Sequence, residues 1–213
     1  MKDKITDHVS ESGGAIILAG GDSKRLGRPK ALLEFNGRSL IALMIDRLSV
    51  LFNELTVVTD RPELYSGLPV MLTGDILKQK GKSPLRGIHA GLSNNEHPYQ
   101  FVVACDMPFL NLELIKYMAR FAPAYDAVVP HVGGEYYQPL HAFYKRSCID
   151  VIEQQVSQGR FKVNEFYRNL KVRFITTAEI ARYDPGHNSF ININTWEDYE
   201  QALELMAGKR ESI

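Results

Sequence analysis

The stretch Ala15-Ile-Ile-Leu-Ala-Gly-Gly-Asp-Ser-Lys-Arg-Leu-Gly-Arg-Pro-Lys30 decides how this chain of 213 residues is interpreted. Its first four residues are apolar and typical of a short buried strand. Two glycines follow, and then three basic side chains and a final lysine. Glycine can adopt positive φ and bring backbone N–H groups close to anionic oxygens. The stretch therefore predicts a phosphate-binding loop, in which Gly20 and Gly21 provide backbone and Arg25 and Lys30 provide charge.

The glycine spacing excludes two better-known loops. A Walker loop has four residues before its Gly-Lys-Ser/Thr ending, whereas Gly27 comes after a longer gap and is followed by Arg28. The dinucleotide-binding spacing G-x-G-x-x-G is absent as well. Pro29 disfavours a helix running straight on from the glycines, because the residue before proline is pushed away from helical angles. A long, open, basic loop is expected, and an ordinary Gly-rich turn with solvated charges is the alternative.

Composition predicts an ordinary globular protein, with 45% hydrophobic and 23% charged residues. Lys plus Arg and Asp plus Glu both number 25, so the net charge is zero and a nucleic-acid surface is not expected. No apolar run approaches the roughly 20 residues of a membrane span. We expect one domain over residues 1–213, in the cytoplasm, with polar residues 1–12 as a flexible tail rather than a targeting peptide. Cys105 and Cys148 have no metal-ligand spacing and are expected to be reduced thiols.

Short β-branched runs alternate with longer amphipathic stretches along the chain. This alternation predicts a three-layer α/β/α fold with a mainly parallel sheet. Gly133-Gly134 resembles a hairpin turn, which predicts an antiparallel portion at the sheet edge. Thr195 and Asp198 are spaced as a capping box for the last helix. The predicted strands are residues 15–18, 55–59, 69–73, 100–104, 126–130, 140–144, 171–176 and 190–193, and the predicted helices are residues 40–51, 85–93, 112–121, 147–158 and 195–207.

Asp106 lies just past the carboxyl end of the predicted strand 100–104. In open α/β sheets, ligands bind outside such strand ends, and the basic loop follows the first strand in the same way. A buried carboxylate needs a cation or donors, and one that faces phosphates is well placed to hold Mg²⁺. The alternative is an aspartate that begins the turn at Met107-Pro108.

Other polar residues also follow predicted strands. Asp75, after the strand 69–73, could accept the paired donors N1 and N2 of guanine, or it could bind its own backbone as loop aspartates do. Asp60 is a weaker candidate of the same kind, and Arg86 could meet phosphate or a second substrate, although such arginines are more often solvated.

Two asparagines, Asn192 and Asn194, follow the apolar residues of the last predicted strand. Strand alternation would put both on one face, where their amides could orient metal-bound water or ligand oxygens. Asparagines before a helix are commonly caps instead. The six histidines form no metal-binding pair, and no nucleophile elbow is present.

Taken in order, these motifs resemble the MobA-type molybdenum cofactor guanylyltransferases, within the larger nucleotidyltransferase fold group. The resemblance covers residues 14 to about 203, and its order and spacing are more specific than any one motif. It implies a Rossmann-like nucleotidyltransferase fold. The matching stretches are Leu18-Ala-Gly-Gly-Asp-Ser-Lys-Arg-Leu-Gly27 with Lys30, Thr73-Gly-Asp75, Pro84-Leu-Arg-Gly-Ile88, Cys105-Asp-Met-Pro-Phe109 and Phe190-Ile-Asn-Ile-Asn-Thr195.

The resemblance also implies roles for individual residues. Asp106 would bind Mg²⁺, Asp75 would read guanine, and Arg25, Lys30 and Asp106 would carry catalysis. Leu-Ala-Gly-Gly accompanies guanine specificity in this family, and Leu-Ala-Ala-Gly is typical of its cytidylyl relatives, so residues 18–21 favour GTP. The implied nucleotide-binding residues are Leu18, Ala19, Gly20, Gly21, Lys30, Asp75 and Asp106. The implied metal ligand is Asp106, and Asn192 and Asn194 are candidates to contact metal-bound water or the groups around the metal.

The implied activity is the transfer of GMP from GTP to the terminal phosphate of molybdopterin, with or without molybdenum, and with release of pyrophosphate. Other molybdenum cofactor proteins are expected partners. A cytidylyl or sugar-phosphate nucleotidyltransferase is the nearest alternative. A GTP-sensing module without chemistry is another, although it would need no metal carboxylate such as Asp106.

Two positions depart from the family pattern. Ser83 stands where the family usually has Gly, and Trp196 replaces the usual Pro. Both departures could reshape the surroundings of the pterin. Possible pterin-side contacts by position are Lys162, Asn164, Arg168 and His141, for which an ordinary surface position is the favoured interpretation.

Overall fold

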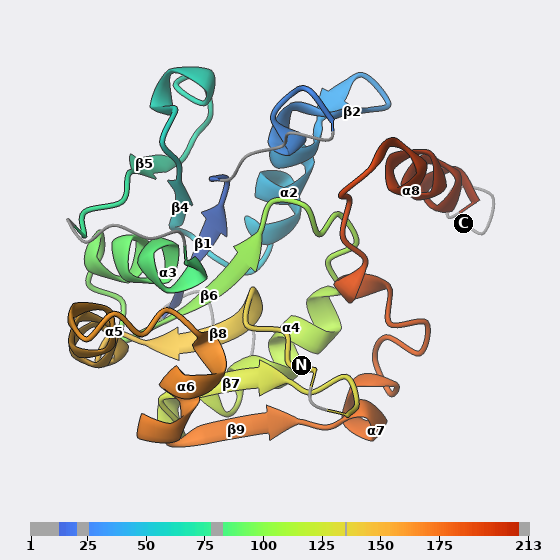
Figure 1. Cartoon of the computed structure of the whole chain (residues 1–213). Helices are drawn as coiled ribbons and strands as arrows, with labels where there is room; N and C mark the ends of the chain where they lie inside the picture. The colour runs from blue at the N-terminus through green and yellow to red at the C-terminus, as the bar shows by residue number, and fades with distance from the viewer. Residues whose placement is uncertain (1–12, 21–25, 78–82, 135, 209–213) are drawn as a thin grey trace.

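A seven-stranded sheet forms the centre of the protein in the computed structural model (Figure 1). The model describes residues 13–20, 26–77, 83–134 and 136–208, so the expected tail at residues 1–12 lies outside the described part. The strand order is β5-β4-β1-β6-β8-β7-β9. The strands are β1 (Gly13–Leu18), β4 (Leu55–Val58), β5 (Met71–Thr73), β6 (Tyr99–Ala104), β7 (Ala127–Pro130), β8 (His141–Lys145) and β9 (Val172–Ile175).

Most neighbouring strands run parallel. β1 pairs in parallel with β4 and β6, β4 with β5, and β7 with β9. β8 is antiparallel to both β6 and β7. The predicted mainly parallel sheet with an antiparallel portion is therefore confirmed, but the antiparallel strand lies inside the sheet and not at its edge. The predicted turn also forms, since Gly133 and Gly134 have φ of 111° and 58° and the Val132 N–H donates to the Tyr136 carbonyl at 3.0 Å.

Helices cover both faces of the sheet, as predicted (Figure 1). The side chains of Ala15 and Ile17 on β1 enter one hydrophobic core with α2 and α4, and Ile16 enters the other core with α3 and α5. This alternation makes three layers from a strand that is buried on both sides. The helices are α2 (Leu40–Leu48), α3 (Pro84–Ser93), α4 (Leu112–Ala119), α5 (Cys148–Ser157), α6 (Val163–Phe166), α7 (Thr177–Ile180) and α8 (Trp196–Gly208), and the short strands β2 (Glu34–Phe35) and β3 (Arg38–Ser39) form a separate hairpin.

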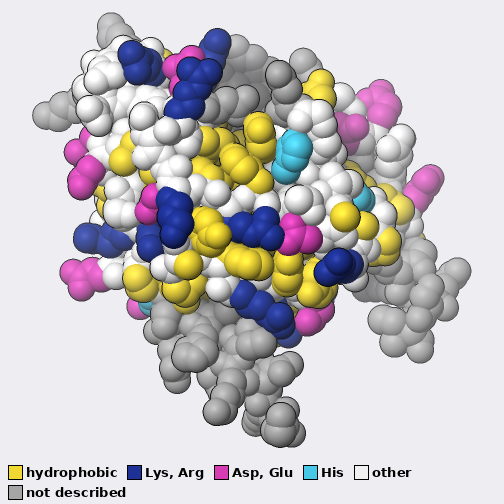
Figure 2. Space-filling model, turned by 90° about the horizontal axis from the view of Figure 1, so that it is seen from below, with side chains coloured by type: hydrophobic (Ala, Val, Ile, Leu, Met, Phe, Trp, Pro, Cys, Tyr) yellow, Lys and Arg dark blue, Asp and Glu magenta, His cyan; other side chains and the backbone are white. Residues whose placement is uncertain are grey.

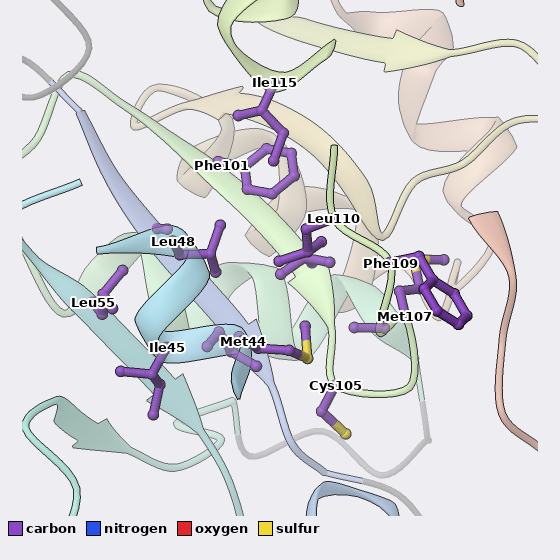
Figure 3. Close-up of a cluster of buried hydrophobic side chains, with 14 of the residues drawn as sticks. Met44, Ile45, Leu48, Leu55, Phe101, Cys105, Met107, Phe109, Leu110 and Ile115 are labelled. Atoms are coloured by element: carbon purple, nitrogen blue, oxygen red, sulfur yellow. The ribbon is translucent and has the colours of Figure 1, made fainter. Parts of the chain in front are cut away.

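The core beside α2 reaches up to the carboxyl end of β6. Figure 3 shows Met44 and Leu48 of α2 close to β6 and to the loop that follows it, where Cys105 and Met107 lie. Burial, and secondly the charge of Asp106, raise the pKa of the Cys105 thiol to about 12, so it stays protonated. Both cysteines are free, in agreement with the prediction of reduced thiols.

The chain path creates a switch point in the sheet. From β1 the chain builds β4 and β5 on one side, and then returns to build β6 on the other side of β1. In open α/β sheets, the loops on either side of such a point diverge and leave room for a ligand at the carboxyl ends of the strands. The loops after β1 and β6 are therefore the first place to look for a site.

The predicted strand at residues 190–193 is wrong. A 3-10 helix (Asn188–Phe190) forms instead, and no ladder follows it. The buried Asp184 carboxylate accepts hydrogen bonds from the N–H groups of Asn188 (3.1 Å) and Ser189 (2.7 Å), which turns the chain there. One backbone bond, from the Ile193 N–H to the Asp106 carbonyl at 2.9 Å, then fastens the segment to the β6 loop.

Basic and acidic side chains are interspersed on the face of the molecule in Figure 2. This mixture agrees with the zero net charge of the sequence. Among the described helices, none is both long enough and apolar enough to cross a membrane.

Candidate functional site

Lys30 joins three segments at the switch point. Its Nζ lies 2.8 Å from Asp106 Oδ2 and 2.7 Å from Asn194 Oδ1. The three residues come from the loop after β1, the loop after β6 and the segment before α8. Lys30 and Asp106 retain 19% and 18% of their side-chain exposure, so a ligand can reach them while much of the bulk water is kept away. The structure thus brings together Lys30, Asp106 and Asn194 from the predicted set.

Short-range hydrogen bonds hold Asn194 in place. The carboxylate of Asp198 accepts from the N–H groups of Asn194 (2.8 Å) and Thr195 (2.9 Å), and the Thr195 hydroxyl accepts from the Asp198 N–H (3.2 Å). This is the predicted capping box, and it begins α8. Hydrogen bonding, first from Asn194, lowers the pKa of Asp198, which keeps the cap charged.

The first residues of the basic loop continue the sheet pattern. The Leu18 carbonyl accepts from the Cys105 N–H at 3.0 Å, and the Ala19 N–H donates to the Val58 carbonyl at 2.9 Å. These bonds tie the start of the loop to both neighbouring strands. The backbone of Leu18 and Ala19 is therefore held in place at the switch point.

The glycines of the loop differ from expectation. Gly20 is exposed, has no positive φ, and has open space where a Cβ would stand. The left-handed conformation is found at Gly27 instead, with φ of 68°, where the chain turns before Pro29. The missing side chain of Gly20 thus allows a ligand to approach the backbone closely. The expected positive φ is not found at this glycine. The predicted residues Gly21 and Arg25 lie outside the described part of the chain.

Asp75 is engaged by its own surroundings. Its Oδ1 accepts from the Leu77 N–H at 3.0 Å, and its Oδ2 lies 2.5 Å from Arg86 Nε. Arg86 Nη2 also donates to the Leu77 carbonyl. Arg86 is therefore largely buried and not solvated, and it shapes the loop around Asp75, while a contact of Arg86 with phosphate or with a second substrate stays a prediction. Asp60 is exposed after β4.

Two further candidates do not join the Lys30 cluster. The Asn192 side chain donates to the Phe190 carbonyl at 3.1 Å, so it folds back on its own backbone. Because residues 190–193 are not a strand, the alternation that put both asparagines on one face does not apply. His141 is fully buried between the rings of Phe101 and Phe190, and is neither a surface residue nor open to a pterin. Burial lowers its pKa to about 4, so its imidazole is neutral at pH 7.

The remaining predicted pterin-side residues lie in or next to α6. Lys162 and Arg168 are exposed, as the favoured surface interpretation expects. Their segment packs through Phe166 and Tyr167 into the core that contains α3 and α5. The side chain of Asn164 is outside the described part.

Ser83 and Trp196, the two departures from the family pattern, make specific contacts. The sequence did not predict any of these contacts. The Ser83 hydroxyl accepts from the Leu85 N–H at 3.2 Å as the cap of α3, and donates to the Phe161 carbonyl at 2.8 Å. Trp196 is 41% exposed and stacks with the Arg28 guanidinium, 5.6 Å from the ring centroid. Arg28 precedes Lys30 by two residues, so this stack connects the basic loop to the start of α8.

The oxygens at the switch point fit a hard divalent cation. Asp106 supplies a carboxylate and Asn194 an amide oxygen, which are ligands that Mg²⁺ takes along with water and substrate phosphates. Asp106 Oδ1 is buried, and it has no hydrogen-bond partner among the residues that the structure describes. A buried carboxylate oxygen without a donor is costly unless something binds it. Within the described ranges, the switch point included, no group of three or more His, Cys, Asp or Glu side chains could hold a metal.

A three-layer α/β/α fold with a lysine and a carboxylate at its switch point places charged groups where ligands of such folds bind, and the comparisons identify the class of protein as the nucleotidyltransferases. Residues 15–173 match the model of the MobA-like NTP transferase domain. The chain belongs to this family.

Named relatives extend over most of the chain. A molybdenum cofactor guanylyltransferase of Desulfosudis oleivorans is 39% identical over 197 residues, which cover 91% of this chain and 96% of the relative. A probable molybdenum cofactor guanylyltransferase of Peptoclostridium acidaminophilum is 38% identical, with coverage of 91% and 89%. The crystal structure of molybdopterin-guanine dinucleotide biosynthesis protein A from Archaeoglobus fulgidus superposes with a TM-score of 0.79 at 27% identity, covering 92% of this chain and 99% of that one.

Proposed function

We propose that this protein is a molybdenum cofactor guanylyltransferase. It transfers GMP from GTP to the terminal phosphate of molybdopterin, with or without molybdenum, and forms a molybdopterin guanine dinucleotide. The observation that carries the proposal is the meeting of Lys30, Asp106 and Asn194 at the switch point. The names of relatives that match along more than nine tenths of the chain support the choice of substrates.

The chemistry is an attack of a phosphate oxygen on the α-phosphorus of GTP. A new P–O bond forms, the bond between the α-phosphorus and its bridging oxygen breaks, and pyrophosphate leaves with the electron pair. A phosphate nucleophile is already ionised at neutral pH, so no general base is required. This fits a site whose polar groups are a lysine, a carboxylate and amides.

The residues of the chain would act by alignment and by neutralising charge. The Lys30 ammonium would bind the oxygens of the triphosphate, and the exposed backbone at Gly20 would let the phosphates approach closely. We assign Gly21 and Arg25 to the same task. Mg²⁺ held by Asp106, with Asn194 beside it, would supply Lewis-acid stabilisation of the charge that develops on the phosphates.

We assign the guanine end to Asp75. The carboxylate accepts one backbone N–H and one guanidinium contact, and each of its oxygens has a second lone pair for N1–H and N2–H of the base. Arg86 would hold this carboxylate in position. A single nucleotidyltransferase domain, a cytoplasmic location and contact with other molybdenum cofactor proteins remain predictions.

Release of pyrophosphate tests the proposal. The purified chain, mixed with GTP, MgCl₂ and molybdopterin, should release pyrophosphate, and Asp106→Ala should lower the rate by ~10²–10³, as expected for one lost group in a preorganised site. Asp46→Ala is a matched control, because Asp46 forms an exposed ion pair with Arg38 away from the switch point. Faster release with CTP would reject the guanine assignment, and near-normal turnover of Asp106→Ala would remove Asp106 from the mechanism.

A further inference from the structure

The Lys30 ammonium lies between two oxygens that come from distant parts of the chain. It donates to Asp106 Oδ2 at 2.8 Å and to Asn194 Oδ1 at 2.7 Å, across 76 and 164 residues of sequence. One cation thus holds together the two oxygens that are best suited to bind a metal. A position between a carboxylate oxygen and an amide oxygen is one that a hard divalent cation would also take.

The contact leaves Asp106 only partly satisfied. Oδ2 has the ammonium, whereas Oδ1 is buried and without a hydrogen-bond partner in the described part of the chain. A monovalent ammonium is therefore a weaker match to this carboxylate than a divalent ion would be. The backbone around Asp106 is fixed, since its carbonyl accepts from the Ile193 N–H. The lysine side chain, on four flexible methylenes, is the partner that can move.

We propose that Lys30 holds the place of the divalent cation in the nucleotide-free protein and gives it up when the triphosphate arrives. The ammonium then moves from Asp106 and Asn194 to the phosphates, and the cation takes the two oxygens. This inference rests on the proposed function, because it assumes that a triphosphate with its cation is the substrate.

The exchange has a thermodynamic consequence. A metal that enters the nucleotide-free protein must break the contacts of Lys30 with Asp106 and Asn194, and this cost weakens its binding. When the nucleotide supplies anionic oxygens for Lys30, the same metal binds tightly. The two ligands are thus positively coupled, and the coupling passes through one side chain. The protein would avoid holding a metal at Asp106 in the absence of substrate.

Binding of Mn²⁺ in the absence of any nucleotide tests this proposal. Electron paramagnetic resonance of free Mn²⁺ gives the Kd for the wild type, for Lys30→Met and for Lys116→Met. Lys116 forms a comparable ion pair with Glu113, at 2.7 Å, on α4. Its removal changes the net charge equally without touching the site. Lys30→Met should bind Mn²⁺ up to about fivefold more tightly than the wild type, which corresponds to the loss of one partly exposed ion pair, and Lys116→Met should bind as the wild type does.

Further variants identify the bound oxygens. Adding Asp106→Asn to Lys30→Met should abolish the gain, because the carboxylate is lost. Lys30→Gln provides a second neutral side chain, and circular dichroism checks the folding of each variant. Equal or weaker Mn²⁺ binding by the Lys30 variants would overturn the exchange. Failure of this proposal and failure of the proposed function can be told apart, since pyrophosphate release can fail while the Mn²⁺ shift is seen, and the reverse can also occur.

Discussion

Gly91 of α3 packs tightly against Ile16 of the sheet, and this contact leads to a sharp prediction. A Cβ built at Gly91 would stand 2.5, 2.7 and 2.9 Å from Cγ2, Cδ1 and Cγ1 of Ile16 on β1. Ile16 is fully buried in the sheet and β-branched, so its side chain has little freedom to turn away. Gly91→Ala should therefore destabilise the protein.

The magnitude follows from two opposed effects. Alanine in a helix interior is favoured over glycine by about 1 kcal/mol. Overpacking of a tight core costs ~1–3 kcal/mol, and contacts of this closeness belong at the upper end. The expected net loss is about 2 kcal/mol in the free energy of unfolding.

Gly87, one helical turn earlier, is the matched control. A Cβ there would stand 3.2 Å from Cδ2 of Leu18, the far end of a flexible side chain. Gly87→Ala should keep most of the helix gain and be neutral or stabilising by up to about 1 kcal/mol. Urea unfolding followed by circular dichroism gives both values. A Gly91→Ala protein as stable as Gly87→Ala would refute the reasoning.

A double-mutant cycle separates the clash from other effects. Ile16→Ala alone removes the three carbons that meet the new methyl group, at a cost of ~2–5 kcal/mol. In that background Gly91→Ala should cost nothing or should stabilise, which gives a coupling energy above ~1 kcal/mol. Additive effects would place the cause of the loss elsewhere.

Two more predictions concern polar groups near the site. His141 has a folded pKa of about 4 against 6.5 in the unfolded chain, so the unfolded state binds a proton first as the pH falls. The contribution of the neutral imidazole to the free energy of unfolding is full above pH 6.5 and decreases towards pH 4. Between pH 7.5 and pH 5 the free energy of unfolding should fall by about 2 kcal/mol through this group. Urea titrations at both pH values should show this loss in the wild type and not in His141→Phe. Equal pH dependence in the two proteins would contradict this. Asp198→Ala removes the cap of α8 and should lower the free energy of unfolding by about 1 kcal/mol and weaken GTP turnover through Asn194, whereas unchanged values would show that the cap is redundant.

Sequence patterns predicted the sheet well because its strands are short β-branched runs buried on both faces. They failed at residues 190–193, where the chain is just as apolar. There the deciding interactions are polar. The Asp184 carboxylate is near in sequence but is not part of an apolar pattern, and the Asp106 carbonyl is distant in sequence. The position of the antiparallel strand β8 inside the sheet could not be predicted either, because a hairpin turn indicates which strands pair but not the final strand order.

The site was partly predictable for a topological reason. Residues after the carboxyl ends of parallel strands gather at one edge of the sheet, so Lys30 and Asp106 could be paired from sequence. The bond from Lys30 to Asn194 could not, since it depends on the backbone link that brings the segment before α8 to the β6 loop. Nor could the stack of Arg28 on Trp196, for which the only signal was that Trp196 departs from the family pattern.

Strand order gives the proposed reaction a direction. Asp75 follows β5 and Asp106 follows β6, with β4 and β1 between them. Three strand spacings of about 4.8 Å separate the two carboxylates by roughly 14 Å along the edge of the sheet. A nucleotide whose base binds at the end of β5 would therefore have its phosphates near the ends of β1 and β6, where Lys30 lies. If the leaving pyrophosphate stays with the basic loop, the incoming phosphate would approach from the β6 side, past Asn194 and the start of α8. Trp196, whose ring lies against Arg28 at the start of α8, would then affect the second substrate more than GTP.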